Sequence, residues 1–431
     1  MDTDLKTRMS PSLALLTLAR LTPDAHEMRI ANENLDAIDY GCDVDVVGIT
    51  VTVDVVPRAV QIARAFQARG IPVVAGGIHV TCCPEACAPL FDAVCVGAAE
   101  RVWVRMLEDV QAGRLQKVYH DMAGFTGAEL VPPAYEKAAD SRYLYTNVVD
   151  TSRGCPNRCD FCYNSCRNRA HMRRPIDDVM KDIQAIGTRH VLFIDDNFIG
   201  DPAYTQELLE RMRGMNLTWG AAVTTRIAQY PRILDLMAQT GCKSLFIGFE
   251  SINNPSLRGV NKDNAFEHYE ALVDAIHSRG IMLNASMVFG LDGDGPDVFS
   301  QTLDWLVAHK VETLTSHILT PYPGTALHRR MEEAGRIISR DLSLYNTAHV
   351  VFRPAKMTPE ELRAGYLWMY RKFYSFRNIF RRLPEHKSQW VPYLLFNLFY
   401  RKFGWFSSML SCLIPMHLLG RVAARVSYQV K

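Results

Sequence analysis

Between residues 143 and 334 the sequence alternates strand-like and helix-like segments at a spacing of roughly 30 residues, the size of one βα unit. Each short, β-rich apolar run is followed by a segment whose apolar residues recur at helical spacing. The strand-like runs lie at 143–150, 190–196, 218–224, 244–249, 282–289 and 313–319. The helix-like segments lie at 176–186, 203–213, 231–239, 265–279, 298–309 and 325–334. Strands separated by helices indicate an α/β fold with a parallel sheet.

Three cysteines follow the first of these strand-like runs. They stand at Cx3Cx2C spacing in the segment 153–162, which reads Arg-Gly-Cys-Pro-Asn-Arg-Cys-Asp-Phe-Cys. Pro156 and the polar residues between the thiols favour a loop, in which the sulfur atoms can converge. Thiolates select soft metal ions and iron–sulfur clusters, and a four-iron cluster with three cysteines keeps one iron open for an outside ligand. The alternatives are a zinc site or a closed cluster with Cys166 as fourth ligand, but structural zinc usually takes two separated Cys pairs.

The motif resembles the radical SAM signature CxxxCxΦC, in which Φ is an aromatic residue, here Phe161. The resemblance implies that Cys155, Cys159 and Cys162 bind a [4Fe-4S] cluster whose open iron binds the amino and carboxylate groups of S-adenosylmethionine (SAM). Phe161 would pack beside SAM. In that superfamily an electron from a reductase, flavodoxin or ferredoxin cleaves the sulfonium to give a 5′-deoxyadenosyl radical. The six βα units are similar to its partial (β/α)6, TIM-like barrel, with the chemistry at the carboxyl ends of the strands.

Polar residues at later strand ends match the same superfamily. Asp195 and Asn197 end the second predicted strand, where family members place polar groups against the SAM amino group. Side chains alternate along a strand, so residues 195–197 cannot all face SAM. Glu250 and Ser251 end the fourth strand, where a polar residue meets the ribose hydroxyls, although Glu250 could instead pair with a nearby arginine. The remaining candidates follow the fifth and sixth strands and are Gly290 and Tyr322.

Residues 11–111 show a second βα pattern. The strand-like runs are 28–31, 44–50, 72–75 and 93–96, and the helix-like segments are 11–21, 57–69 and 100–111. This order predicts a doubly wound, Rossmann-like parallel sheet that binds its ligand at the carboxyl ends of the strands. Those ends carry Gly76, Gly77 and Gly97, and paired glycines let a flat ligand approach the backbone closely.

The segments around these glycines resemble the cobalamin-binding-like domain that precedes many radical SAM domains. The resembling stretches are Asp-Val-Val-Gly-Ile-Thr at 45–50, Ala-Gly-Gly-Ile-His-Val-Thr at 75–81 and Asp-Ala-Val-Cys-Val-Gly-Ala-Ala-Glu at 92–100. The resemblance implies that Gly76, Gly77, His79 and Gly97 lie beside bound cobalamin. Two features depart from the family: the DxHxxG loop that supplies a cobalt-binding histidine in some cobalamin proteins is absent, and the usual first strand is missing or replaced by ten polar residues. A lone histidine such as His79 is more typical of a loop or packing residue than of a cobalt ligand.

A group of cysteines follows His79 and comprises Cys82, Cys83 and Cys87. Cysteines outside disulfides are often small buried hydrophobes. The alternative is a site for a soft ion or a thiophilic substrate.

Length and composition fit a globular protein of two or three domains, with 431 residues of which 48% are hydrophobic. The predicted division is 1–112 (cobalamin-binding-like domain), 113–142 (connector), 143–345 (radical SAM core) and 346–431 (helical, basic extension). Eleven cysteines without regular pairing spacings indicate a reducing compartment. The sequence shows neither a signal peptide nor an apolar run of membrane-spanning length, so a cytoplasmic location is predicted.

The C-terminal extension is strongly basic, because residues 371–431 contain eleven Lys and Arg residues and the single acid Glu385. Thr358, Pro359 and Glu361 predict a capped helix start. The aromatic, apolar segment 390–419 suits helices that pack on the barrel, or a peripheral contact with the inner face of a membrane and a lipid-like substrate. It is too apolar for a nucleic-acid surface.

The resemblances together predict radical chemistry on a small or lipid-like metabolite, with cobalamin-dependent C-methylation as the favoured reaction. A cobalamin-free rearrangement is one alternative. Transfer of the aminocarboxypropyl group of SAM to a soft acceptor held by the cysteines at 82–87 is another. From a different class, the chain could be an iron–sulfur electron carrier or redox sensor, although such a protein does not need adenosine-binding strand ends.

Overall fold

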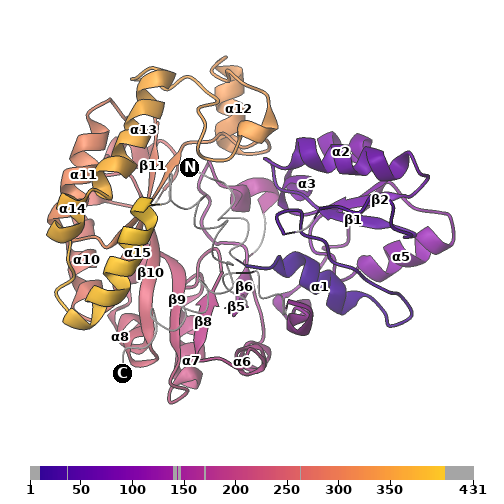
Figure 1. The fold of residues 1–431 in the computed structure, drawn as a ribbon, viewed down its shortest axis with the longest axis horizontal. Coiled ribbons are helices and arrows are strands. Elements are labelled where there is room, and N and C mark those ends of the chain that lie inside the picture. Colours follow the sequence, from indigo (N-terminus) through magenta and orange to yellow (C-terminus); the bar gives the residue numbers. More distant parts are fainter. Residues whose placement is uncertain are drawn as a thin grey trace.

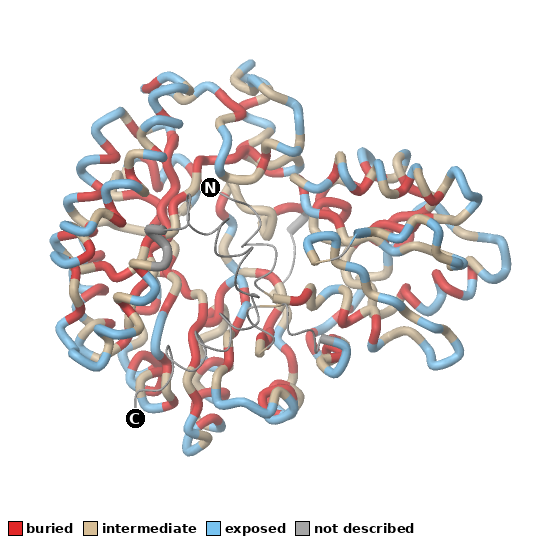
Figure 2. Tube along the Cα trace, in the orientation of Figure 1, coloured by how far each residue is buried: buried red, intermediate tan, exposed pale blue. Residues whose placement is uncertain are grey.

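The computed structural model describes residues 10–402 except 36, 139–142, 144–146, 169–170 and 263. Two parallel sheets organise this part of the chain, a smaller N-terminal sheet and a larger barrel sheet (Figure 1). Buried residues concentrate along the strands of both sheets, while the outer faces of the helices are exposed (Figure 2). The predicted α/β fold with a doubly wound N-terminal sheet, a partial barrel and a helical extension is confirmed.

In the described residues the N-terminal sheet has four parallel strands in the order β1-β2-β3-β4. These are β1 (Val47–Thr50), β2 (Val73–Gly76), β3 (Ala93–Cys95) and β4 (Val118–Tyr119). The helices are α1 (Leu13–Leu21), α2 (Val56–Gln67), α3 (Ile78–Cys82), α4 (Pro84–Cys87) and α5 (Trp103–Gln111). Apolar residues of α2 pack with Val73 and Ala75 on one face of the sheet, and those of α5 pack with Val74 and Ala93 on the other. Helices therefore cover both faces.

The N-terminal sheet differs from the prediction at its margins. Residues 28–31 form no strand; this predicted strand is wrong, because the run alternates between exposed and half-buried positions and gains no buried face. The short strand β4 was missed, since two residues give no periodic pattern. The predicted absence of a strand before α1 concerns residues that include 1–9, which lie outside the described part of the chain.

Within the described residues the barrel sheet has six parallel strands in the order β12-β11-β10-β9-β8-β5. They are β5 (Val148–Val149), β8 (His190–Phe193), β9 (Thr218–Thr224), β10 (Cys242–Glu250), β11 (Met282–Phe289) and β12 (Thr313–Ile318). The helices around them are α6 (Ile176–Ala185), α7 (Pro202–Met212), α8 (Pro231–Gln239), α9 (Asn254–Arg258), α10 (Tyr269–His277), α11 (Val298–Ala308) and α12 (Ala326–Glu333). This sheet stays open between β5 and β12, as the prediction of a partial barrel requires.

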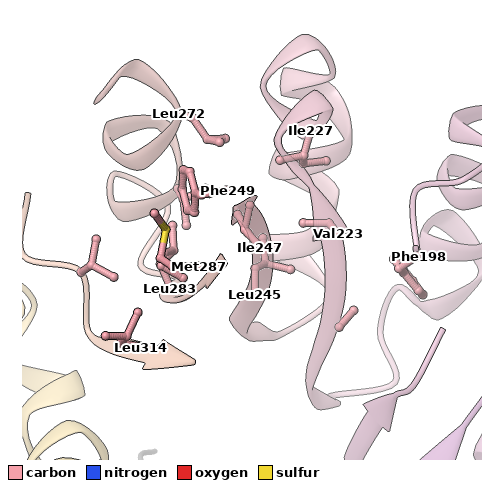
Figure 3. Packing of buried hydrophobic residues seen from close by; sticks show 14 of the residues in the cluster. Phe198, Val223, Ile227, Leu245, Ile247, Phe249, Leu272, Leu283, Met287 and Leu314 are labelled. Carbon is pink, nitrogen blue, oxygen red and sulfur yellow. The ribbon is translucent and has the colours of Figure 1, made fainter. Parts of the chain in front are cut away.

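The core of the barrel lies between the strands and these helices. Strand residues that face the surrounding helices, such as Val223, Ile247 and Met287, belong to one buried cluster with helix residues such as Leu272 (Figure 3). All four are at most 4% exposed. Such packing fixes the positions of the strand ends, from which the candidate site is built.

The C-terminal helices cover the open edge of β12. They are α13 (Pro359–Phe373), α14 (Phe376–Arg381) and α15 (Trp390–Lys402), and α13 begins with the predicted capping box. The hydroxyl groups of Tyr370 and Tyr374 each accept a hydrogen bond from a backbone N–H of β12 and donate one to a β12 carbonyl. The two tyrosine hydroxyls thus make the hydrogen bonds that a neighbouring strand would make with these residues of β12.

The buried guanidinium of Arg382 fixes these helices at the amino end of the barrel. It donates to the carbonyls of Val311 and Glu312, just before β12, and to Asn397 of α15. Figure 1 shows α13, α14 and α15 on the side of the barrel away from the N-terminal sheet. The predicted packing of this extension on the barrel is present for the residues up to 402, which cover mainly the side of the barrel, whereas residues 403–431 lie outside the described part of the chain.

Candidate active site

The three motif cysteines lie on one loop between two short strands. We call residues 154–171 the cluster loop; it joins β6 (Ser152–Arg153) to β7 (Met172–Arg173), which pair in antiparallel fashion. Gly154 has φ of +85°, a conformation that side chains resist, and turns the chain from β6 into the loop. The hairpin follows β5, so the loop lies at the carboxyl end of the barrel sheet.

The barrel holds the middle of the cluster loop through the backbone of Asp160. The Asp160 N–H donates to the carbonyl of Val260 at 3.0 Å, and its carbonyl accepts from the N–H of Leu327 at 3.0 Å. Its carboxylate also pairs with Arg330. The neighbouring Phe161 is half-buried and packs against the barrel core. Its predicted contact with SAM stays a prediction.

The thiols of Cys155, Cys159 and Cys162 are close enough to influence one another's ionisation. Burial is the main cause that raises the pKa of each thiol, for Cys162 to about 12, and Cys155 contributes to the shift of both others. Cys166, in the 3₁₀ helix Tyr163–Asn168, instead influences the ionisation of Tyr163. Metal ligation releases the thiol protons and supplies the positive charge that stabilises thiolates. The donor set therefore fits a cluster with three cysteine ligands.

Asp195 ties the end of β8 to the strand that leads into the cluster loop. Its fully buried carboxylate accepts hydrogen bonds from Thr151 N at 3.1 Å, from Thr151 Oγ1 at 2.7 Å and from Ser152 Oγ at 2.6 Å. Desolvation raises the pKa of Asp195 to about 6, although these donors oppose the shift. Its predicted place beside the SAM amino group stays a prediction, and its observed contacts are structural.

Asn197, two residues further on, faces the cluster loop. It is 3% exposed, and its side chain adjoins Cys155, whose pKa it lowers. Its Oδ1 atom lacks a hydrogen-bond partner among the described residues. A buried acceptor without a partner is unfavourable unless a ligand supplies the donor, and an amino group such as that of SAM is such a donor. Asp196, between the two, is exposed and influences the pKa of Cys155 and Cys162.

Glu250 forms a buried ion pair with Lys262, a residue that the sequence reasoning missed. Lys262 Nζ lies 2.8 Å from Glu250 Oε1, and the two side chains are 8% and 10% exposed. The Lys262 ammonium also lowers the pKa of Cys155 and Cys159, so the pair adjoins the cluster loop. Glu250 has φ of +65°, a strained conformation found at functional sites. An ion-pair partner was foreseen as an arginine, whereas the structure provides a lysine; the ribose contact of Glu250 stays a prediction.

Ser251 and Gly290 occupy neighbouring strand ends. Ser251 Oγ is buried and accepts a hydrogen bond from Asn253 N at 3.0 Å. Gly290 has φ of +96°, and a Cβ atom there would lie 2.8 Å from Leu362 of α13. Their predicted contacts with SAM stay predictions, and in the structure Gly290 allows α13 to approach the end of β11.

The cluster loop also contacts the N-terminal sheet through an aromatic group. The Tyr163 hydroxyl and His79 Nδ1 are hydrogen-bonded at 3.0 Å. The Tyr163 ring stacks on Tyr322, with centroids 4.7 Å apart and planes inclined by 17°. His79 therefore contacts the cluster loop of the barrel, as expected of a packing residue. The role of Tyr322 beside SAM stays a prediction, although burial, with a contribution from Cys162, raises its pKa to about 12.

A cavity of about 230 Å³ lies at the carboxyl ends of the N-terminal strands. Gly76, Gly77 and Gly97 line it, together with α1, α5 and two residues next to the cluster loop, Asp150 and Arg153. Gly77 has φ of +102°, and a Cβ atom there would lie 2.8 Å from the backbone of Val51. The glycines therefore form a wall of bare backbone that faces the barrel.

The cysteine group at 82–87 divides between two environments. Cys87 lies in the core beneath α2, and burial raises its pKa to about 11, as expected of a small hydrophobe. Cys82 donates to the carbonyl of Tyr163 at 3.8 Å, and Cys83 Sγ lies against Gly324. Among the described residues, no three His, Cys, Asp or Glu side chains converge on a site for one metal ion.

Comparisons with known proteins agree with this architecture. Residues 149–306 match the model of the radical SAM superfamily, and residues 325–397 match a domain of unknown function, DUF4070. Bacteriochlorophyllide d C-12(1)-methyltransferase of Chlorobaculum tepidum is 30% identical over 372 residues, which are 83% of this chain and 81% of that protein. Hopanoid C-2 methylase of Rhodopseudomonas palustris is 29% identical over 355 residues, 77% of this chain and 66% of that protein.

Solved structures share the fold at lower identity. The cobalamin-dependent SAM radical enzyme OxsB aligns with a TM-score of 0.66 and 14% identity, over 92% of this chain and 69% of that one. The methyltransferase TsrM of Kitasatospora setae aligns with a TM-score of 0.60 and 18% identity, over 75% and 73% of the two chains. The barrel, the cluster loop and the matched model define a radical SAM enzyme. The chain belongs to that superfamily, in the branch that carries an N-terminal cobalamin-binding-like domain.

Proposed function

We propose that this enzyme is a cobalamin-dependent radical SAM methyltransferase that methylates a carbon atom of a small or lipid-like metabolite. The observation that carries the proposal is the position of the glycine-lined cavity, whose wall includes residues next to the cluster loop. The two relatives described above are named for methylation of a bacteriochlorophyllide and of a hopanoid. When bound, the cluster and SAM supply the radical that abstracts a hydrogen atom, and cobalamin supplies the methyl group.

The chain's own residues hold these groups. Cys155, Cys159 and Cys162 would bind the cluster. Asn197 would accept a hydrogen bond from the SAM amino group. The ammonium of Lys262, paired with Glu250, would lie beside the cluster thiolates. A reductase, flavodoxin or ferredoxin would supply the electron. We also propose that the chain divides into domains after residues 112, 142 and 345, as predicted from the sequence.

The cavity residues fit cobalamin. The bare backbone at Gly76, Gly77 and Gly97 admits a flat ring, and the apolar side chains of Trp103 and Met106 suit its mostly apolar body. A cavity of about 230 Å³ admits part of so large a cofactor. His79 is not among the residues that line the cavity, and its Nδ1 is hydrogen-bonded to Tyr163, so we propose that it lies beside cobalamin without ligating cobalt.

Equilibrium dialysis with hydroxocobalamin tests this proposal. We expect the wild-type protein to retain about one cobalamin per chain. Gly76→Leu should weaken retention at least tenfold, because its side chain would enter the cavity; here a Cβ atom meets only Cys95, at 3.7 Å, so the fold should tolerate the change. Gly41→Leu is the matched control, since Gly41 is exposed, lies outside the cavity and has no positive φ, and a Cβ atom there would meet only the side chain of Asp39, at 3.3 Å. Folded, cluster-loaded wild type without retained cobalamin would overturn the methyltransferase proposal.

We also propose that α14 and α15 contact the surface of an anionic membrane, which would bring a lipid-like substrate to a cytoplasmic enzyme. Apolar side chains are exposed on these helices, among them Phe376 at 51%, Phe380 at 56% and Val391 at 54%. Arg377 and Arg381 lie beside them on α14. None of the described helices is long and apolar enough to cross a bilayer. Exposed aromatic side chains next to arginines suit the interface between headgroups and acyl chains.

Flotation with phosphatidylglycerol vesicles at low salt tests the membrane contact. The wild type should float with these vesicles, and flotation should fall as salt screens the basic residues. Phe376→Ser/Phe380→Ser should reduce flotation severalfold, whereas Ile338→Ser, at an exposed apolar residue outside these helices, should not. Point substitutions are preferable to removal of residues 385–431, because Tyr393 and Asn397 are buried. The proposal would be contradicted if all variants floated as well as the wild type, or if the wild type did not float at all.

A further inference from the structure

The cysteine motif of the cluster loop is flanked on both sides by residues that contact the N-terminal domain. Arg153, two residues before the first cluster cysteine, pairs with Glu100 at 2.6 Å. Tyr163, directly after the last cluster cysteine, is hydrogen-bonded to His79 at 3.0 Å. Glu100 and His79 each lie within three residues of a glycine at a strand end, Gly97 after β3 and Gly77 after β2. The same strand ends line the cavity.

The first attachment is an ion pair between a buried carboxylate and a partly exposed guanidinium. The Glu100 side chain is 3% exposed and that of Arg153 is 26% exposed. Arg153 also lies 3.5 Å from Asp150 and donates to Thr17 Oγ1 of α1 at 3.4 Å. Glu100, Arg153, Asp150 and Thr17 all line the cavity. Charged groups that have lost this much water depend on their partners, so the pair cannot separate without cost.

The second attachment is a buried neutral contact. His79 is 2% exposed, and burial lowers its pKa, which favours the uncharged imidazole. The backbone N–H of His79 donates a hydrogen bond to the carbonyl of Val51, just after β1, at 3.1 Å. Stacking on Tyr322 and the bond from Cys82 hold Tyr163 from two further sides. Tyr163 therefore joins three segments: the cluster loop, the N-terminal sheet and the loop after β12.

We propose that the pairs Glu100–Arg153 and His79–Tyr163 form a clamp that couples ligand binding at the N-terminal strand ends to the order of the cluster loop. The identity of that ligand, a corrin, rests on the proposed function. A ligand that orders the segments 77–79 and 97–100 also orders the residues to which the loop is attached. When the loop is already ordered, SAM binding causes a smaller loss of conformational entropy and is therefore tighter. Because linkage is reciprocal, SAM must tighten cobalamin binding by the same factor.

The test measures SAM affinity of cluster-loaded, full-length protein with and without hydroxocobalamin, from the change that SAM causes in the electron paramagnetic resonance signal of the reduced cluster. In the wild type we expect cobalamin to tighten SAM binding about fivefold or more. In Glu100→Gln/Tyr163→Phe this factor should fall to about one when it is measured at a hydroxocobalamin concentration that saturates the variant. The matched control is Glu33→Gln/Tyr40→Phe, which removes the same groups from exposed contacts with Arg58.

Several outcomes would overturn the clamp. They are a wild type in which both ligands bind without coupling, a double variant that keeps the full coupling, and a control that loses it. If the wild type retains no cobalamin, the proposed function fails, and the clamp is then judged on the loop alone. In that case an iron chelator should remove the cluster severalfold faster from Glu100→Gln/Tyr163→Phe than from the control. Equal rates would overturn the clamp as well.

Discussion

Replacement of Cys155, Cys159 and Cys162 by alanine should leave a folded protein that takes up no [4Fe-4S] cluster and cleaves no SAM. The three thiols are the soft ligands of the cluster loop, and a cluster with three cysteine ligands cannot persist when all three are removed. The loop itself should survive, because backbone hydrogen bonds of Asp160 hold it to the barrel. Iron and sulfide analysis, with chromatography of the nucleoside products, measures the effect.

Cys166→Ala is the control for this triple variant. Cys166 is buried in the 3₁₀ helix that follows the motif, and it influences the ionisation of Tyr163. We expect Cys166→Ala to keep the full cluster and its SAM cleavage. A full cluster in the triple variant would contradict the account. Loss of the cluster in Cys166→Ala would instead indicate a closed site with four cysteine ligands.

Lys262→Met should both destabilise the protein and stop SAM cleavage. Its ammonium lies 2.8 Å from Glu250 in a buried setting, and removal of one partner from such a pair costs about 3–5 kcal/mol. The same ammonium is the cation that influences both Cys155 and Cys159. Loss of a preorganised charge at a reacting centre reduces rates by roughly a hundredfold or more. Urea unfolding and the initial rate of SAM cleavage measure the two effects.

A second substitution separates stability from activity at this pair. In Lys262→Met/Glu250→Gln the buried carboxylate is gone, so most of the lost stability should return, while SAM cleavage should stay low. Lys243→Met, at an exposed lysine of β10, is the control for the loss of a lysine and should change neither property. Near-normal cleavage by the double variant would show that the Lys262 charge has no role at the cluster loop.

The periodic parts of the chain were the ones that the sequence predicted well. All six barrel strands form in the predicted order along the chain, because each apolar run is buried between neighbouring strands and helices. The capped start of α13 at Thr358 was also predicted, since the capping box is a local interaction. Residues 28–31 were assigned to a strand in error, because four β-rich residues gain nothing without a buried face.

The candidate site could be predicted only where its chemistry lies in a local motif. The Cx3Cx2C spacing indicated the cluster loop directly. By contrast, the roles of Lys262 and Tyr163 depend on contacts with Glu250 and His79, which lie 12 and 84 residues away along the chain, and no spacing rule connects such pairs. For Asp195 the sequence predicted the position at a strand end but not the contacts. Its hydrogen bonds with Thr151 and Ser152 depend on the three-dimensional path of the hairpin.

The central claim is most directly tested by the nucleoside products that the reconstituted enzyme forms from SAM under anaerobic, reducing conditions, with and without bound cobalamin. Each candidate reaction leaves a different product. Radical cleavage gives 5′-deoxyadenosine, methyl transfer gives S-adenosylhomocysteine, and aminocarboxypropyl transfer gives 5′-methylthioadenosine. The account predicts 5′-deoxyadenosine whenever the cluster is present, and S-adenosylhomocysteine only when cobalamin is also bound. 5′-Deoxyadenosine alone with cobalamin bound, or 5′-methylthioadenosine as the main product, would contradict it.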